Sequence, residues 1–222
     1  MVKKFIIVVY IMNFIYKDNK LFQFDKSRKF PRHLDNLIDD WIIDKGKDLY
    51  PFWRKMNFTP NDLTTVSLVL GVISVLLFYK KWFILSAISY FLSYCFDVFD
   101  GNYARKYNLT TKFGDYYDHI KDLLVNVLMG YVFLKYSKLD KRLLIFVSIV
   151  AIILFIISNI HLGCQEIYNS FYNPEHKNTY LAFLKVYCNK KFISNINILK
   201  HFGCGTFFLW MTLIILLNVI NR

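Results

Sequence analysis

Residues 97–122 read DVFDGNYARKYNLTTKFGDYYDHIKD and hold four aspartates where two apolar segments meet a polar loop. Asp97 and Asp100 are three residues apart, and Asp118 and Asp122 are four apart. On helical backbone, each pair projects from one face of its helix. A carboxylate inside a membrane span costs about 2.5 to 3.5 kcal/mol on insertion scales, so acids grouped in this way need a compensating partner. A divalent cation held by carboxylate oxygens is the simplest such partner.

Small and basic residues between the two pairs complete a longer pattern. Gly101 lets a ligand approach the backbone, and Ala104 keeps the next helical turn narrow. Arg105 supplies a planar guanidinium that suits phosphate oxygens. Gly114 lies four residues before Asp118 and therefore clears the same face of the second helix. These residues predict a site for a phosphate-bearing ligand beside the acids.

The whole pattern is D-x2-D-G-x2-A-R-x8-G-x3-D-x3-D, and every fixed position in it is filled. It resembles the signature of the CDP-alcohol phosphotransferases, also described as the class-I CDP-alcohol phosphatidyltransferase family. Residues 57–71, NFTPNDLTTVSLVLG, are similar to that family in their TPNxLT opening of a span. The resemblance implies a membrane-embedded transferase of phospholipid biosynthesis. Such an enzyme moves a phosphatidyl or phospho-alcohol group from a CDP-alcohol to an acceptor hydroxyl and releases CMP.

The resemblance also implies roles for individual residues. Asp97, Asp100 and Asp118 would hold the metal, and Asp122 would take the proton from the attacking alcohol. The residues that would border the cytidine and its phosphates are Gly101, Ala104, Arg105 and Asn61. For Asn61, a role as a helix cap is the alternative. Oxygen ligands suggest Mg²⁺, with Mn²⁺ as the alternative, because hard oxygen sites suit both ions.

Two features of the motif favour different acceptors. The stretch FDGNYARKYNLTTKFG looks most like the branch of the family that uses inositol or glycerol phosphate. The pair Asp118 and His119 is similar to the branch that transfers phosphoethanolamine or phosphocholine to diacylglycerol. On a helix, His119 points roughly 100° away from Asp118, which predicts a peripheral position for the imidazole. The partners expected are a CDP-alcohol donor and a lipid or small-alcohol acceptor.

The composition favours a membrane protein. The chain has 222 residues, of which 55% are hydrophobic and 19% aromatic, which is too apolar for one soluble domain. The formal net charge of +12 points to membrane lipids or a phosphate-bearing substrate, and no nucleic-acid motif is present. We therefore predict an all-α integral membrane protein: a bundle of about five to six transmembrane helices preceded by an interfacial amphipathic helix.

The spans can be placed along the chain. Residues 1–60 form an N-terminal anchor and juxtamembrane helix, and residues 61–222 form the polytopic transferase domain. A loop over 102–113 joins the second and third spans, and no part of 163–201 is long and apolar enough to cross. The five spans expected are 63–79, 82–99, 116–134, 143–162 and 203–220. Because the family usually has six, either this chain lacks the last span, or the N-terminal segment or a second copy in a homodimer completes the bundle.

The N-terminal region holds two further apolar segments. Residues 5–16 are too short for an ordinary span, so an interfacial or re-entrant anchor is favoured over a signal peptide or a short true span. Beyond Pro31, apolar and acidic residues alternate with helical period, which predicts an amphipathic helix in the membrane interface. Its apolar positions are Leu34, Leu37, Ile38, Trp41 and Ile42, and its acids are Asp35, Asp39, Asp40 and Asp44.

Basic residues and cysteines bear on orientation and compartment. Twenty Lys and Arg residues fall on the motif side of the predicted spans and seven on the other side. This bias predicts a multi-pass protein whose active site faces the cytoplasm. The four cysteines show no short CxxC spacing, so we expect packing residues rather than a zinc site or a disulfide framework.

Two alternatives to an active transferase remain. A catalytically inactive relative would keep the motif without turnover. A cation transporter would use the acids to line a pathway, but it would more naturally place them near the middle of the membrane on interrupted helices. The four aspartates instead form one cluster at one edge, which favours the enzyme.

Overall fold

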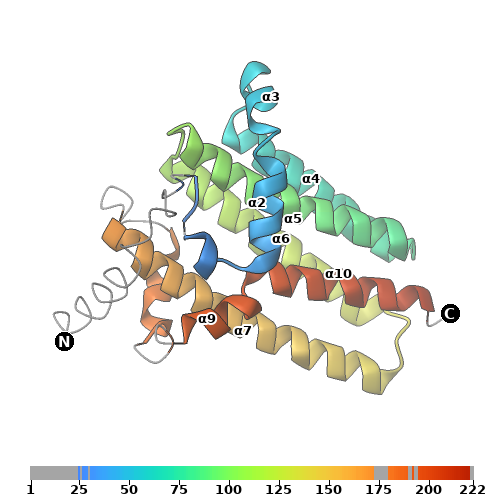
Figure 1. Cartoon of the computed structure of the whole chain (residues 1–222). Coiled ribbons are helices and arrows are strands. Elements are labelled where there is room, and N and C mark those ends of the chain that lie inside the picture. The colour runs from blue at the N-terminus through green and yellow to red at the C-terminus, as the bar shows by residue number, and fades with distance from the viewer. Residues whose placement is uncertain are drawn as a thin grey trace.

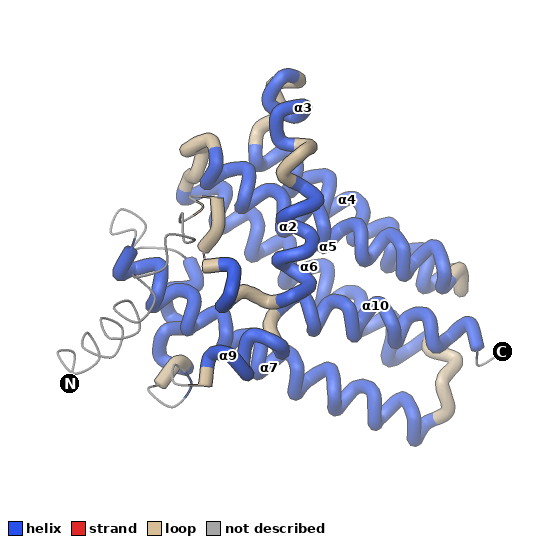
Figure 2. The backbone as a smooth tube through the Cα atoms, in the orientation of Figure 1, coloured by secondary structure: helices blue, strands red, loops and turns tan. Residues whose placement is uncertain are grey.

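A computed structural model describes residues 25, 27–29, 31–172, 180–189, 192 and 195–220, and within that part of the chain every regular element is a helix (Figure 2). The five long helices are α4 (Pro60–Tyr79), α5 (Phe83–Lys106), α6 (Lys112–Tyr136), α7 (Lys141–Tyr172) and α10 (Cys204–Ile220). They lie side by side as a bundle (Figure 1). The apolar segment 5–16 lies outside the described residues.

Four segments of the described chain are long and apolar enough to cross a membrane: Pro60–Tyr79, Phe83–Lys106, Lys141–Ile167 and Ile196–Ile220. The prediction of an all-α membrane protein is therefore confirmed. The fifth long helix, α6, has 25 residues, but its first half carries charged side chains that lower its apolar character. The number of crossings stays a prediction for this reason.

Small polar residues bring α4 and α5 close together. Ser67 and Ser93 each donate a hydrogen bond to the other's backbone carbonyl at 2.8 Å. Ser74 and Ser86 repeat the arrangement, also at 2.8 Å. These bonds satisfy hydroxyls that would otherwise be costly to bury. The close contact fixes where the first turns of α4 meet the last turns of α5.

The second long helix is longer than the sequence analysis expected. We predicted a span ending at residue 99 and a loop over 102–113, but α5 continues as helix to Lys106 and the loop is short. Continuous helix satisfies the backbone N–H and C=O groups of the motif without other partners. It also keeps the first acid pair and the small residues that follow it on one rigid element.

Short helices precede the bundle. They are η1 (Arg32–Leu34), α2 (Leu37–Gly46) and α3 (Tyr50–Lys55), and α2 lies across the bundle against α5 and α10 (Figure 1). The side chain of Asn36 caps α2 by accepting a 3.0 Å hydrogen bond from the backbone of Ile38. The expected amphipathic helix thus exists, although it begins after Leu34. Its apolar residues divide between two sides, because Leu37 and Trp41 are exposed while Ile42 is buried in the bundle.

A second group of short helices follows α7. These are η3 (Tyr180–Tyr187), α9 (Ile196–Leu199) and η4 (Lys200–Phe202). The described part of 163–201 contains no additional crossing before Ile196. Cys164 in α7 forms a disulfide with Cys188, while Cys95 and Cys204 are free. The expectation that all four cysteines only pack was therefore wrong, because it considered only cysteines close together in the sequence.

Candidate active site

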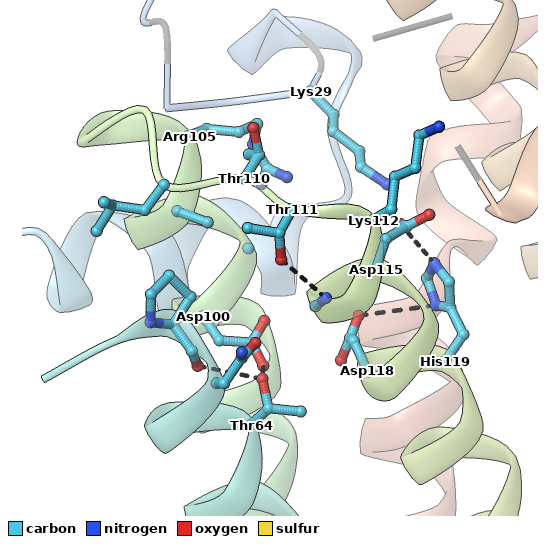
Figure 3. A pocket seen from close by; sticks show the side chains of 16 residues that line it. Lys29, Thr64, Asp100, Arg105, Thr110, Thr111, Lys112, Asp115, Asp118 and His119 are labelled. Atoms are coloured by element: carbon cyan, nitrogen blue, oxygen red, sulfur yellow. Dashed lines mark hydrogen bonds and ion pairs between the residues drawn. The ribbon is translucent and has the colours of Figure 1, made fainter. Parts of the chain in front are cut away.

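A cavity of about 420 Å³ lies where α4 begins, α5 ends and α6 begins (Figure 3). Its wall combines residues of these three helices, the loop between α5 and α6, and one residue from the N-terminal segment. The lining residues are Lys29, Pro60, Asn61, Thr64, Asp100, Gly101, Ala104, Arg105, Leu109, Thr110, Thr111, Lys112, Gly114, Asp115, Asp118 and His119.

Most of the site residues expected from the sequence line this cavity. Those that do are Asn61, Asp100, Gly101, Ala104, Arg105 and Asp118. Asp97 and Asp122 are not part of the lining, and each contacts the ammonium group of Lys121 instead. The cavity wall therefore exposes one acid from each predicted pair, and the other acid of each pair lies beside the lysine.

We call Asp97, Asp100, Asp118 and Asp122 the motif acids. The carboxylates of the first three lie close together. Asp97, Asp100 and Asp118 each offer a carboxylate oxygen, and these oxygens lie within 4.8 Å of one another. Helical spacing on α5 aligns the first two, and the packing of α5 beside α6 brings in the third. Segments separated in the sequence by the whole α5–α6 loop thus form one oxygen-rich cluster.

The cluster fits a divalent cation. Carboxylate oxygens are the ligands that magnesium and manganese prefer. Asp118 Oδ1 is buried and lies 3.3 Å from Lys121 Nζ without forming a hydrogen bond of good geometry, which leaves its lone pairs for a metal ion. A second group of ligand atoms, from Asp118, His119 and Asp122, also lies within 4.8 Å. Asp118 belongs to both groups and is the acid most central to any metal bound there.

Lys121 is the main residue that sequence reasoning missed. It is only 2% exposed, and its Nζ lies 3.3 Å from Asp118, 2.8 Å from Asp122 and in direct contact with Asp97. One lysine does not balance four aspartates, so within the described residues the motif acids still lack a matching set of basic partners. Lys121 is three residues after Asp118 on α6, a spacing that places it on the same inward face and would have revealed it.

Thr64 is a second residue that the sequence analysis did not single out. Its hydroxyl donates a 2.6 Å hydrogen bond to Asp100 Oδ2, and it lies 3.1 Å from the backbone carbonyl of Pro60. Thr64 is the last residue of the TPNDLT stretch at the start of α4, so the signal was present in the sequence. The bond fixes the orientation of the Asp100 carboxylate, which leaves its other oxygen for a ligand.

Asn61 faces the cavity and does not cap α4. The cap is Thr59, whose side chain accepts from the backbone of Asp62 in a capping box. The alternative role of Asn61 as a helix cap is therefore wrong. A Cβ atom placed on Gly114 would lie 3.0 Å from Asn61 Oδ1, so a side chain at Gly114 would crowd the amide. The glycine thus lets α6 approach the first turn of α4 across the cavity.

Arg105 points toward the N-terminal segment. Its Nε donates a 2.7 Å hydrogen bond to the backbone carbonyl of Ser27. A Cβ atom on Gly101 would lie 3.3 Å from Arg105 Nη1, so the missing side chain leaves room for the guanidinium beside the helix. One donor of Arg105 is therefore occupied by protein, and the group remains at the cavity wall.

His119 lines the cavity, contrary to the expected peripheral position. Its Nε2 lies 3.3 Å from Asp115 Oδ1, and its Nδ1 lies 3.7 Å from Asp118 Oδ2 (Figure 3). The sequence argument considered only the angle between His119 and Asp118 on the helix. The cavity extends around the start of α6, so side chains on both of these faces reach it.

Comparisons with known proteins find a matching family and two relatives. A family model described as CDP-alcohol phosphatidyltransferase matches residues 57–220. The CDP-diacylglycerol--glycerol-3-phosphate 3-phosphatidyltransferase of Rickettsia typhi is 36% identical over 89 residues, which are 39% of this chain and 50% of the relative. The protein of the same name from Rickettsia prowazekii is 36% identical over 85 residues, 37% of this chain and 47% of the relative. The chain spans about half the length of these curated relatives. No solved structure matches it.

Proposed function

Because this chain belongs to the CDP-alcohol phosphatidyltransferase family, we propose that it is a transferase of phospholipid biosynthesis. It moves a phosphatidyl or phospho-alcohol group from a CDP-alcohol to an acceptor hydroxyl and releases CMP. The observation that carries the proposal is the convergence of the Asp97, Asp100 and Asp118 carboxylates within 4.8 Å, beside a cavity of about 420 Å³. A cavity of this size accommodates a nucleotide-sized ligand.

The proposed cofactor is Mg²⁺, with Mn²⁺ as the alternative, held by Asp97, Asp100 and Asp118. Such an ion supplies positive charge for the diphosphate of the donor. Lys121 supplies a further positive charge and keeps the acids close together before any ion binds. Thr64 fixes the Asp100 carboxylate through its hydrogen bond.

The remaining roles follow the family resemblance. Asp122 is the proposed general base for the attacking hydroxyl. Its carboxylate lies 2.8 Å from Lys121 Nζ. Asn61, Gly101, Ala104 and Arg105 are the proposed contacts of the cytidine and its phosphates, and each of them lines the cavity.

The proposed acceptor is a small alcohol that carries a phosphate. The two Rickettsia relatives are named for transfer to glycerol 3-phosphate. The cavity also contains three cationic side chains, Lys29, Arg105 and Lys112, which suit an anionic acceptor. Transfer of phosphoethanolamine or phosphocholine to diacylglycerol is the alternative, motivated by the adjacent Asp118 and His119.

A panel of donors and acceptors tests the function. The purified protein in lipid nanodiscs is given CDP-diacylglycerol with glycerol 3-phosphate or inositol, and separately CDP-ethanolamine or CDP-choline with diacylglycerol. We expect CMP release and a new phospholipid in the arm with CDP-diacylglycerol and glycerol 3-phosphate. Absence of CMP in every arm, from protein that still binds CDP-diacylglycerol, identifies an inactive relative. Ion flux through proteoliposomes without CMP release identifies the transporter.

The proposed location is a membrane, with the site facing the cytoplasm. The bias of Lys and Arg supports this orientation. The Cys164–Cys188 disulfide opposes it, because Cys164 is two residues from Glu166, which contacts Lys29 of the cavity, and disulfides rarely persist in the cytosol. Alkylation of thiols in intact cells decides whether the site faces the cytoplasm. If Cys164 and Cys188 are both labelled without reductant, the cytoplasmic site is supported, and if their disulfide is intact, it is ruled out.

The homodimer stays a prediction, to be tested by the mass of the purified protein in detergent.

A further inference from the structure

The cavity receives a residue from outside the region that matches the family. The family model begins at residue 57, yet Lys29 lines the cavity. Lys29 belongs to residues 27–29, which we call the strap. Figure 3 shows the Lys29 side chain reaching down toward the start of α6 from the side opposite Thr64. The site is thus incomplete if only the family-matched region is considered.

A buried arginine holds the strap in place. Arg28 is 3% exposed, and its guanidinium lies 2.8 Å from Asp40, 2.9 Å from Asp44 and 3.5 Å from Asp35. Asp40 and Asp44 are on α2, which packs against α5 and α10. An arginine with several donors fixed by acids of one helix is a rigid anchor. The strap therefore has a defined position relative to the bundle.

Both neighbours of Arg28 contact the site. The backbone carbonyl of Ser27 accepts a 2.7 Å hydrogen bond from Arg105, a predicted substrate contact. Lys29 Nζ lies 3.2 Å from Glu166 Oε1 on α7. The anchored residue is therefore flanked on each side by a residue that reaches the cavity wall.

The charges in the cavity are unevenly distributed. Figure 3 shows Lys29, Arg105 and Lys112 at one end, where Asp115 lies beside Lys112, and Asp100 with Thr64 at the other. A lysine ammonium has three donors, and the Lys29 side chain is partly exposed. Three cations against the one carboxylate of Asp115 make the first end net positive, so it offers donors to an anion, while the other end offers oxygens to a cation.

We infer that Lys29 is a phosphate-binding residue of this site and that it exchanges the carboxylate of Glu166 for a phosphate of the substrate. The inference rests on the proposed function, since it needs a phosphate-bearing ligand in the cavity. Two substrate groups have that chemistry: the phosphate of a phosphorylated acceptor and the diphosphate of the CDP-linked donor. Glu166 holds the ammonium at the cavity edge until the phosphate arrives.

Substitutions of Lys29 separate the two sources of phosphate. For Lys29→Ala we expect KM to rise about 10- to 100-fold for one substrate, because a hydrogen bond between charged groups is lost, with a smaller change in kcat. A rise for glycerol 3-phosphate assigns Lys29 to the acceptor, and a rise for CDP-diacylglycerol assigns it to the donor. Lys29→Arg should keep most of the affinity. The matched control is Lys45→Ala, which removes the same charge from an exposed position of α2 outside the cavity.

A change of Glu166 tests the exchange itself. If Glu166 competes with substrate for Lys29, Glu166→Gln should lower the dissociation constant of the same substrate, and this gain should vanish in the double variant Lys29→Ala/Glu166→Gln. Equilibrium binding of glycerol 3-phosphate and of CDP-diacylglycerol measures this without turnover. A protein that binds but releases no CMP would overturn the proposed function and leave this inference standing. Unchanged affinity for both ligands in folded Lys29→Ala protein would overturn the inference.

Discussion

Two acidic clusters of this protein have the same number of aspartates and different charge balance. The motif acids are Asp97, Asp100, Asp118 and Asp122. In the described structure, Lys121 and His119 form ion-pair contacts with them. The second cluster, which we call the clamp, joins the N-terminal segment to α2. Its acids are Asp25, Asp35, Asp40 and Asp44, and its cations are Arg28, Arg32 and Lys47.

The difference in balance separates a binding site from a structural network. The clamp acids are largely neutralised by fixed side chains, so the clamp needs no ligand and holds the strap in place. The motif acids keep an excess of negative charge beside a cavity, which is unfavourable unless a cation binds. Helical spacing of acids is common to both clusters, and the balance of charge is what distinguishes them.

The largest effects are expected from changes of the motif acids. Chelation should abolish CMP release, and Mg²⁺ or Mn²⁺ should restore it. Asp122→Asn should cut the single-turnover rate by about 10² to 10⁴ with donor affinity retained, because it removes the general base. Asp97→Asn should instead weaken donor binding that depends on metal. Rates and donor affinities measured over a range of magnesium concentrations compare the two variants.

Excess magnesium gives the decisive control for this pair. It should partly rescue Asp97→Asn, because a weakened metal site fills at higher concentration. It should not rescue Asp122→Asn. Equal rescue of the two variants would contradict the base assignment and make Asp122 another metal ligand. Full activity after exhaustive chelation would remove the metal from the proposal.

Removal of the buried ammonium should make the motif acids depend on metal for stability. In Lys121→Met the acids lose their fixed cation, and leaving buried charge unpaired costs about 3 kcal/mol, or roughly 6–12 °C in Tm. We expect that loss in chelator and a large recovery in magnesium. Thermal unfolding with and without metal measures it, with the wild type as reference. If the Tm of Lys121→Met is the same with and without magnesium, a metal ion does not replace the lysine as the cation beside the motif acids.

Within the clamp, two arginines differ in burial and give a matched comparison. Arg28 is 3% exposed and Arg32 is 64% exposed. Arg28→Ala should lower the free energy of unfolding by about 2–3 kcal/mol, because it leaves buried Asp35 without its cation. Arg32→Ala should cost less than about 1 kcal/mol, since exposed ion pairs are weak. Arg28→Ala should also raise KM as Lys29→Ala does, because it releases the strap. Equal changes in unfolding free energy and in KM for the two arginine variants would refute the proposal that Arg28 anchors the strap.

A further effect concerns pH and Asp39 on α2. Burial, together with the neighbouring charge of Asp35, raises the pKa of Asp39 to about 7, and Tyr94 donates a hydrogen bond to its carboxylate. A raised pKa means that the folded protein binds a proton that the unfolded chain releases, so stability is present below about pH 4 and is lost as pH rises toward 7. Asp39→Asn should flatten this slope. Tm measured from pH 4 to 8 checks it, and an unchanged slope would place the titration elsewhere.

The local part of the site could be predicted from the sequence. The positions of Asp97, Asp100, Gly101, Ala104 and Arg105 relative to one another follow from helical spacing. The loop boundary could not be predicted, since the polar residues 102–106 remain helical as the end of α5. Their backbone bonds are satisfied within the helix whatever the polarity of the side chains.

By itself, the sequence determined an all-α membrane fold and a cluster of four aspartates, because apolar length and helical period are local properties. Only the tertiary structure decided what faces that cluster. Thr64 reaches Asp100 through the packing of α4 on α5, and Lys29 reaches the cavity through the clamp. The Cys164–Cys188 bond likewise joins α7 to the residue that follows η3. Contacts between distant segments depend on how helices pack, and no spacing along one chain encodes the distance between two helices.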